Sequence, residues 1–151
     1  MDIRFEAACE QDIPELYELQ LLAFESEAEM IGSRDVPALM ESREHHRSDF
    51  VNWTTMKLVS EDGRIVGAIR YRPDGERIDV GRLMVHPDYR RRGLARRMLE
   101  EVDRACPDKT RELYTCAKSW INIRLYTKMG YCAVKEVTEP GGLSFVYMRK
   151  G

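Results

Sequence analysis

Residues 83–97 read LMVHPDYRRRGLARR. The first three residues are apolar and end a strand-like segment, Pro87 stops that strand, and an amphipathic helix is expected to begin near Gly93. A strand, a tight turn and a helix N-terminus in this order leave free backbone N–H groups at the positive end of a helix dipole. Gly93 permits an unusual φ, and five arginines within eight residues add positive charge. The stretch is therefore typical of a phosphate or pyrophosphate site.

Two other interpretations of the arginine cluster stay open at this point. It could be a solvated loop, or a nucleic-acid patch whose affinity would depend steeply on salt. The chain has neither a P-loop motif nor the G-x-G-x-x-G motif of a dinucleotide fold. The order of strand, proline, glycine, small residue and helix favours the phosphate site. The formal net charge of −2, from 24 basic and 26 acidic residues, argues against a nucleic-acid partner.

Composition and length are ordinary for a globular protein. With 151 residues, 43% apolar and 33% charged, the chain is expected to form a single domain over 1–151. No long uncharged apolar run is present, and the first six residues carry both charge signs. We therefore expect neither a transmembrane helix nor a signal peptide, no membrane partner, and a cytoplasmic location.

Cysteine and histidine spacing gives no sign of a metal site. Four cysteines without a C-x-x-C pair predict reduced, partly buried thiols. His45 and His46 are adjacent, whereas helical metal ligands usually stand at i and i+4, so a polar surface patch is predicted there.

The remaining sequence alternates between strand and helix periodicity. Turns are predicted at Asp62-Gly63 and Asp74-Gly75, a left-handed helix end at Gly130, and an N-cap at Asp12. The order β-α-α-β-β-β-α-β-α-β-β predicts an α+β (mixed α/β) fold with a mixed sheet flanked by helices. Strands are expected at 2–8, 56–60, 64–72, 77–85, 111–117, 131–137 and 143–149, and helices from residue 13, over 36–50, from 93 to 107 and over 119–129.

Two motifs carry a resemblance to a known family. Residues 90–95, RRRGLA, match the pattern [Q/R]-x-x-G-x-[G/A], and 122–131, NIRLYTKMGY, resemble a second segment ending in LYxxxGY/F. With the leading L-x-V-x-P at 83–87 and the element order, the chain resembles the GCN5-related N-acetyltransferase (GNAT) superfamily over nearly its whole length. The resemblance implies a mostly antiparallel sheet whose two parallel central strands splay apart around acetyl-CoA.

The resemblance also implies roles for individual residues. The strand end would face the pantetheine arm, and backbone N–H groups of the turn would hold the pyrophosphate. The family commonly has Asn where this chain has Ser119, so either Ser119 or Asn122 would contact pantetheine, and Ser119 could instead cap its helix. The implied cofactor-binding residues are Leu83, Met84, Val85, Arg90, Arg91, Arg92, Gly93, Leu94, Ala95, Arg96, Ser119, Asn122 and Tyr126.

Acetyl transfer to an amine needs a proton acceptor and a donor for the departing thiolate. Tyr126 occupies the family's position for the donor, although it could instead be a core aromatic, as we expect for Tyr131. Asp79, with Glu76 behind it, is the candidate base, although a solvated carboxylate is an equal alternative. The expected function is an N-acetyltransferase that uses acetyl-CoA, no metal, and a small-molecule or peptide amine in a ternary complex. The alternative is a non-catalytic acyl-CoA-binding or regulatory domain, and a homodimer is one possibility.

Overall fold

The computed structural model describes residues 2–151, and it confirms the α+β class and the expected mostly antiparallel sheet. The seven-stranded sheet has the order β1-β2-β3-β4-β5-β7-β6. Its strands are β1 (Arg4–Ala7), β2 (Thr54–Val59), β3 (Ile65–Asp74), β4 (Arg77–Val85), β5 (Thr110–Cys116), β6 (Cys132–Thr138) and β7 (Ser144–Lys150). The helices are α1 (Ile13–Ile31), α2 (Pro37–Met40), α3 (Arg43–Asp49), α4 (Leu94–Ala105) and α5 (Trp120–Lys128).

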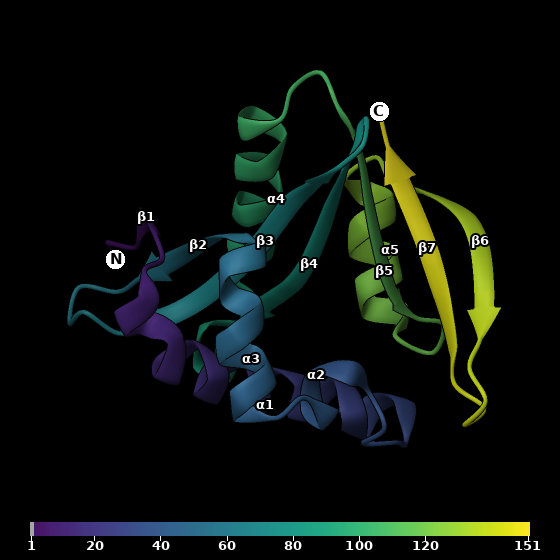
Figure 1. The fold of residues 1–151 in the computed structure, drawn as a ribbon, viewed down its shortest axis with the longest axis horizontal. Coiled ribbons are helices and arrows are strands. Elements are labelled where there is room, and N and C mark those ends of the chain that lie inside the picture. The colour runs from purple at the N-terminus through teal and green to yellow at the C-terminus, as the bar shows by residue number, and fades with distance from the viewer. Residues whose placement is uncertain (1) are drawn as a thin grey trace.

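The two central strands are parallel and separate along their length. β4 and β5 pair only at Arg77 with Thr110, Ile78 with Arg111 and Asp79 with Glu112, within residues 2–151. Figure 1 shows the strands meeting at one end and diverging toward α1 and α2, which cross beneath the opening. The splayed geometry expected from the resemblance is therefore present.

Helices cover both faces of the sheet. The α4 side chains Met98, Leu99 and Val102 are almost fully buried on one face, as their 3.6-residue spacing predicts. On the other face, Leu16 and Leu19 of α1 pack with residues of β3 and β4. Burying each such side chain stabilises the fold by roughly 1.5–3 kcal/mol, so α4 and α1 hold β4 firmly between them.

A bulge changes the direction of side chains halfway along β4. Ala68 of β3 pairs with Met84 and Arg70 pairs with Gly81, so β4 has one extra residue in this interval. The extra residue coincides with Arg82, whose φ of 47° is in the left-handed region. As a result Gly81 and Arg82 both face the side of the sheet that α3 covers.

Several local predictions are confirmed. Gly63, Gly75 and Gly130 have φ values of 82°, 66° and 99°, as the predicted turns and helix end require. All four cysteines are free. No helix in residues 2–151 is long and apolar enough to cross a membrane.

Other local predictions are wrong. The single helix expected over 36–50 is divided into α2 and α3, because Glu41 is extended and the Ser42 hydroxyl accepts a hydrogen bond from the His45 N–H at the start of α3. Asp12 does not cap α1, since its carboxylate instead accepts hydrogen bonds from the Cys9 N–H and from Lys57.

The predicted histidine surface patch is wrong for one of its two residues. His46 is buried, with its ring 5.2 Å from the ring of Tyr17, and burial lowers its pKa. His45 is exposed, as predicted, and it also lines a cavity.

Candidate active site

A cavity of about 460 Å³ lies where β4 and β5 separate. Its walls come from α1, the α2–α3 segment, β3, β4, β5, α5 and β7. The cavity brings together four site residues predicted from the sequence, Asp79, Leu83, Asn122 and Tyr126. The divergence of two parallel strands thus produces an internal site of the size that small ligands occupy.

Tyr126 lies in the interior of this cavity. Its side chain is buried on α5, and its ring lies 6.1 Å from the ring of Tyr131, which is 1% exposed as expected of a core residue. Burial, reinforced by the negative charge of Glu27, raises the pKa of Tyr126 well above its usual value. The hydroxyl is therefore neutral at physiological pH and can donate a hydrogen bond.

Glu27 of α1 is an acidic group in the same part of the cavity that sequence reasoning did not single out. Burial raises the pKa of this carboxyl, and the neighbouring Ser119 hydroxyl offsets part of the rise. A raised pKa makes a carboxylate a better proton acceptor. Its position on the inner face of α1 could be found only once that helix was placed across the opening.

Ser119 and Asn122 both lie beside β5. Ser119 is fully buried at the start of α5, but its hydroxyl makes no helix-capping hydrogen bond, so the capping alternative is wrong. Asn122 donates a long hydrogen bond of 3.4 Å to the Thr115 hydroxyl and lines the cavity. Which of the two would contact pantetheine stays a prediction.

Asp79 lies at the point where β4 and β5 are still paired. Its carboxylate lies 3.3 Å from Arg77 and 3.7 Å from Arg72, so two guanidinium groups neutralise it. Glu76 is exposed in the turn before β4. Asp79 stays a candidate base on sequence grounds, but the carboxylate whose charge acts on Tyr126 is that of Glu27.

The arginine-rich turn has the backbone expected of an anion site. Arg91 and Gly93 have φ values of 63° and 75°, and α4 begins at Leu94. The first N–H groups of α4 therefore have no acceptor within the helix and face the turn. Leu94 is buried, whereas Arg91 and Arg96 are exposed.

Arg90 and Arg92 make hydrogen bonds that hold this turn in place. Arg90 donates hydrogen bonds to the Ser26 hydroxyl and the Ala23 carbonyl of α1, and Arg92 donates one to the Asp88 carbonyl. Of the strand residues expected to face the cofactor, Met84 is buried under α1 and Val85 packs on the α4 face. Any contact from these two would therefore come from their backbone.

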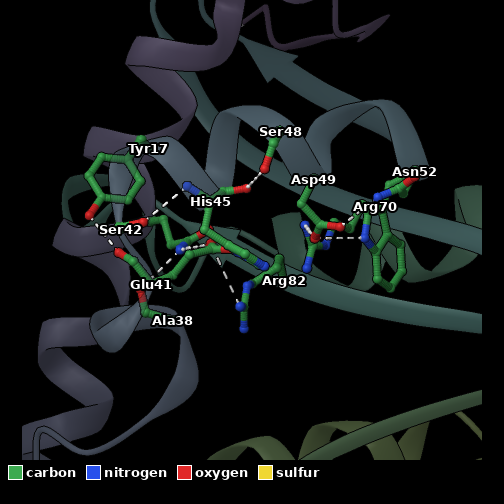
Figure 2. A network of polar contacts seen from close by, with 12 residues as sticks. Tyr17, Ala38, Glu41, Ser42, His45, Ser48, Asp49, Asn52, Arg70 and Arg82 are labelled. Atoms are coloured by element: carbon green, nitrogen blue, oxygen red, sulfur yellow. Dashed lines mark hydrogen bonds and ion pairs between the residues drawn. The ribbon is translucent and has the colours of Figure 1, made fainter.

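The opposite end of the cavity holds a charged network that sequence reasoning missed. The His45 Nδ1 atom lies 2.5 Å from a Glu41 oxygen, and Asp49 stands one turn further along α3. Figure 2 shows Arg70 beside Asp49 and Arg82 beside Glu41. Burial alone would raise the pKa of Glu41, but hydrogen bonds from Gln20 and His45 and the arginine charges outweigh it and lower the pKa.

The ligating atoms of Glu41, His45 and Asp49 lie within 4.8 Å of one another, a spacing that a metal ion could use. However, the Asp49 oxygens already accept hydrogen bonds from Asn52 and Trp53. The two adjacent guanidinium groups also repel a cation. The donor set therefore fits a hydrogen-bonded network better than a metal site.

A comparison with protein-family models identifies the family. Residues 40–151 match the model of the acetyltransferase (GNAT) domain. The chain is 28% identical over 130 residues to the UPF0157 protein YqkA of Bacillus subtilis, with 85% of this chain aligned but only 37% of that protein. The chain thus spans little more than a third of the length of this relative.

Solved structures share the fold at low sequence identity. The ribosomal-protein-S18-alanine N-acetyltransferase of Escherichia coli superposes with a TM-score of 0.79 at 18% identity, covering 99% of this chain and 93% of that one. The PaiA N-acetyltransferase of Thermoplasma acidophilum, solved with coenzyme A, gives 0.77 at 18% identity and covers 99% of both chains. From the match of the family model over residues 40–151, the chain belongs to the GNAT acetyltransferase domain family.

Proposed function

We propose that the chain is an N-acetyltransferase that transfers an acetyl group from acetyl-CoA to a primary amine. The observation that carries this proposal is the buried, neutral Tyr126 inside a cavity formed where β4 and β5 separate. The family match and the neighbour solved with coenzyme A support the same chemistry.

The residues present fit acetyl-CoA. The turn at 90–96 offers left-handed backbone at Arg91 and Gly93 and the N-terminus of α4, which suits a pyrophosphate. The cavity is lined both by β4 residues up to Leu83 and by Tyr126. When bound, acetyl-CoA supplies an activated acetyl thioester.

The chain's own groups would handle the protons of the reaction. The acceptor nitrogen bonds to the carbonyl carbon while the carbon–sulfur bond breaks, so the amine must lose a proton and the thiolate must gain one. Glu27, or alternatively Asp79, would accept the proton from the amine. The Tyr126 hydroxyl would donate to the sulfur as negative charge develops there.

The bulge in β4 supports a further part of this scheme. With one extra residue at Arg82, part of the β4 backbone next to Leu83 is not held in the regular ladder with β3. A backbone N–H released in this way could stabilise the developing oxyanion.

Two measurements test the proposal. Thermal unfolding with saturating acetyl-CoA should show stabilisation of about 2.7 kcal/mol at 100 times the dissociation constant. Thiol release should then be followed across a panel of amino acids, polyamines, peptides and aminoglycosides. Stabilisation with no turnover on any amine would support the alternative, a non-catalytic acyl-CoA-binding domain. If acetyl-CoA gives no stabilisation and no amine is turned over, both the acetyltransferase and the acyl-CoA-binding domain are rejected.

A further inference from the structure

Arg70 and Arg82 hold unused hydrogen-bond donors at the α3 end of the cavity. A guanidinium group carries five N–H donors. Among the residues that the structure describes, Arg70 makes a single long hydrogen bond of 3.4 Å to Asp49, and Arg82 has only an ion pair of 3.7 Å with Glu41. The Nε atoms of both arginines are buried and have no hydrogen-bond partner within residues 2–151.

The neighbouring carboxylates are already engaged by other hydrogen-bond donors. Glu41 accepts hydrogen bonds from Gln20 at 2.9 Å and from His45 at 2.5 Å. Asp49 accepts from Asn52 at 3.0 Å and from Trp53 at 3.1 Å. The arginines therefore have attractive charges nearby but few filled hydrogen bonds.

The two guanidinium groups are also close enough to repel each other. Burial, and then the charge of Arg82, lower the pKa of Arg70 to about 10. The Arg70 guanidinium is fixed in place by the Trp53 ring, whose centroid lies 4.1 Å from its Cζ atom. An anion placed between the two groups would relieve the repulsion and fill their donors.

The backbone of Arg82 adds an independent observation. A non-glycine residue with a φ of 47° is strained, and such strain persists where the surrounding structure enforces it, often at a functional site. Here the strain accompanies the bulge that turns the Arg82 side chain toward the α3 side of the sheet, where it lines the cavity.

We propose that Arg70 and Arg82 bind a carboxylate of the acceptor, so that the acceptor is an amine that also carries a carboxylate. This inference rests on the proposed function. Glu41 and Asp49 lie beside the two arginines, and these carboxylates repel a singly charged carboxylate less than a doubly charged phosphate. Planar guanidinium edges also match the two oxygens of a carboxylate.

A binding experiment tests the subsite without turnover. The arginine Nε–H signals of the protein saturated with coenzyme A are followed by NMR, and sodium acetate, glycine, methylammonium chloride or sodium phosphate is added. We expect acetate and glycine to shift the Arg70 and Arg82 signals, and methylammonium to leave them in place. The proposal is overturned if the Arg70 and Arg82 signals do not respond to acetate or glycine, or if they respond to phosphate alone. It is also overturned if coenzyme A by itself, before any probe is added, shifts these signals in the same way.

Variants connect this subsite to specificity. For amino acids that are acetylated, kcat/KM should exceed that of the matching carboxamides by about 10- to 100-fold, as the loss of charged hydrogen bonds implies. Arg82→Gln and Arg70→Gln should remove most of this preference, and Arg82→Lys should restore part of it. Arg104→Gln, an exposed charge on α4, is the control for net charge.

The outcomes separate this inference from the proposed function. If no amine releases thiol, the proposed function fails, and the NMR titration still decides whether the carboxylate subsite exists. If turnover occurs but the best acceptor lacks a carboxylate, or the arginine variants keep the preference, the subsite is wrong and the acetyltransferase stands. Unchanged stabilisation by acetyl-CoA would show that each variant is folded.

Discussion

Asp79 of β4 stands opposite Glu112 of β5, and theirs is the last of the three pairs that join these strands within residues 2–151. The cavity begins at this pair, because Asp79 and Glu112 both line it. The three pairs hold the two halves of the sheet together, and the strands separate beyond them. Substitutions within the pairs should therefore affect stability, and substitutions of cavity-lining residues beyond them should affect activity.

Gly93→Glu should abolish the stabilisation by acetyl-CoA. Gly93 has a φ of 75° and open space around the position of a Cβ atom, so a glutamate would bring backbone strain and a negative charge to the anion turn. Gly63→Glu is a matched control, since Gly63 has a φ of 82° and equal space in the β2–β3 turn. Thermal unfolding of the two variants with and without acetyl-CoA provides the measurement. If acetyl-CoA still raises the unfolding temperature of Gly93→Glu, the cofactor does not bind at this turn.

Tyr126→Phe should lower kcat by about 100-fold or more while leaving acetyl-CoA binding and folding nearly unchanged. The phenyl ring keeps the packing against Tyr131, and only the hydroxyl is lost. Steady-state kinetics on any acceptor found in the amine panel, together with the acetyl-CoA thermal shift, provide the measurement. A kcat within a factor of three of the wild type would assign Tyr126 to the core alone.

Glu27→Gln should stabilise the protein at neutral pH. The pKa of Glu27 is raised on folding, so its burial costs nothing below the unfolded value of 4.5, and the cost appears as pH rises through the folded pKa. The gain in unfolding temperature should therefore be present at pH 7 and vanish near pH 4. Glu29→Gln, an exposed position on the same helix, serves as the control.

Glu27→Gln also tests which carboxylate is the base. If Glu27 accepts the proton from the amine, Glu27→Gln should lower kcat and abolish the fall of kcat/KM at low pH. Asp79→Asn should then retain that fall. The reverse result would restore Asp79 as the base.

Gly67→Ala should destabilise the fold by about 1–3 kcal/mol. A Cβ atom there would lie 3.2 Å from the Leu58 side chain, the Met98 side chain and the Met84 carbonyl. Gly81→Ala meets only ordinary contacts, the nearest at 3.7 Å from Trp53, and should be close to neutral. Urea unfolding of the two variants measures the difference, and equal stabilities would show that the sheet yields around Gly67.

The sequence predicted best where local chemistry decides the conformation. Gly63, Gly75 and Gly93 stand where a positive φ is required, and the periodicity of 94–102 fixed the buried face of α4. Tyr126 was reached through a family motif, and the structure places it in the cavity.

The α3 end of the cavity was not predictable in the same way. The spacing of Glu41, His45 and Asp49 is visible in the sequence, but charged residues at helical spacing usually form a solvated face. Only the placement of α3 over β3 and β4 shows that these groups meet Arg70 and Arg82. The direction of the Arg82 side chain depends on a bulge, and that bulge is determined by the pairing of β3 with β4. It therefore leaves no local signal in the sequence.

The bulge lets β4 carry one more residue than β3 in this interval while its apolar side chains keep their faces. Before Arg82, Ile78 and Val80 pack toward the α4 side; after it, Leu83 and Val85 do so, and Met84 faces α1. Deleting Arg82 would let the ladder with β3 continue unbroken and would leave each of these apolar side chains on its present face, whereas deleting a residue from a regular strand exchanges the faces beyond the deletion. The extra residue therefore adds nothing to the apolar packing of β4, and its effect is to present the Arg82 side chain to the cavity.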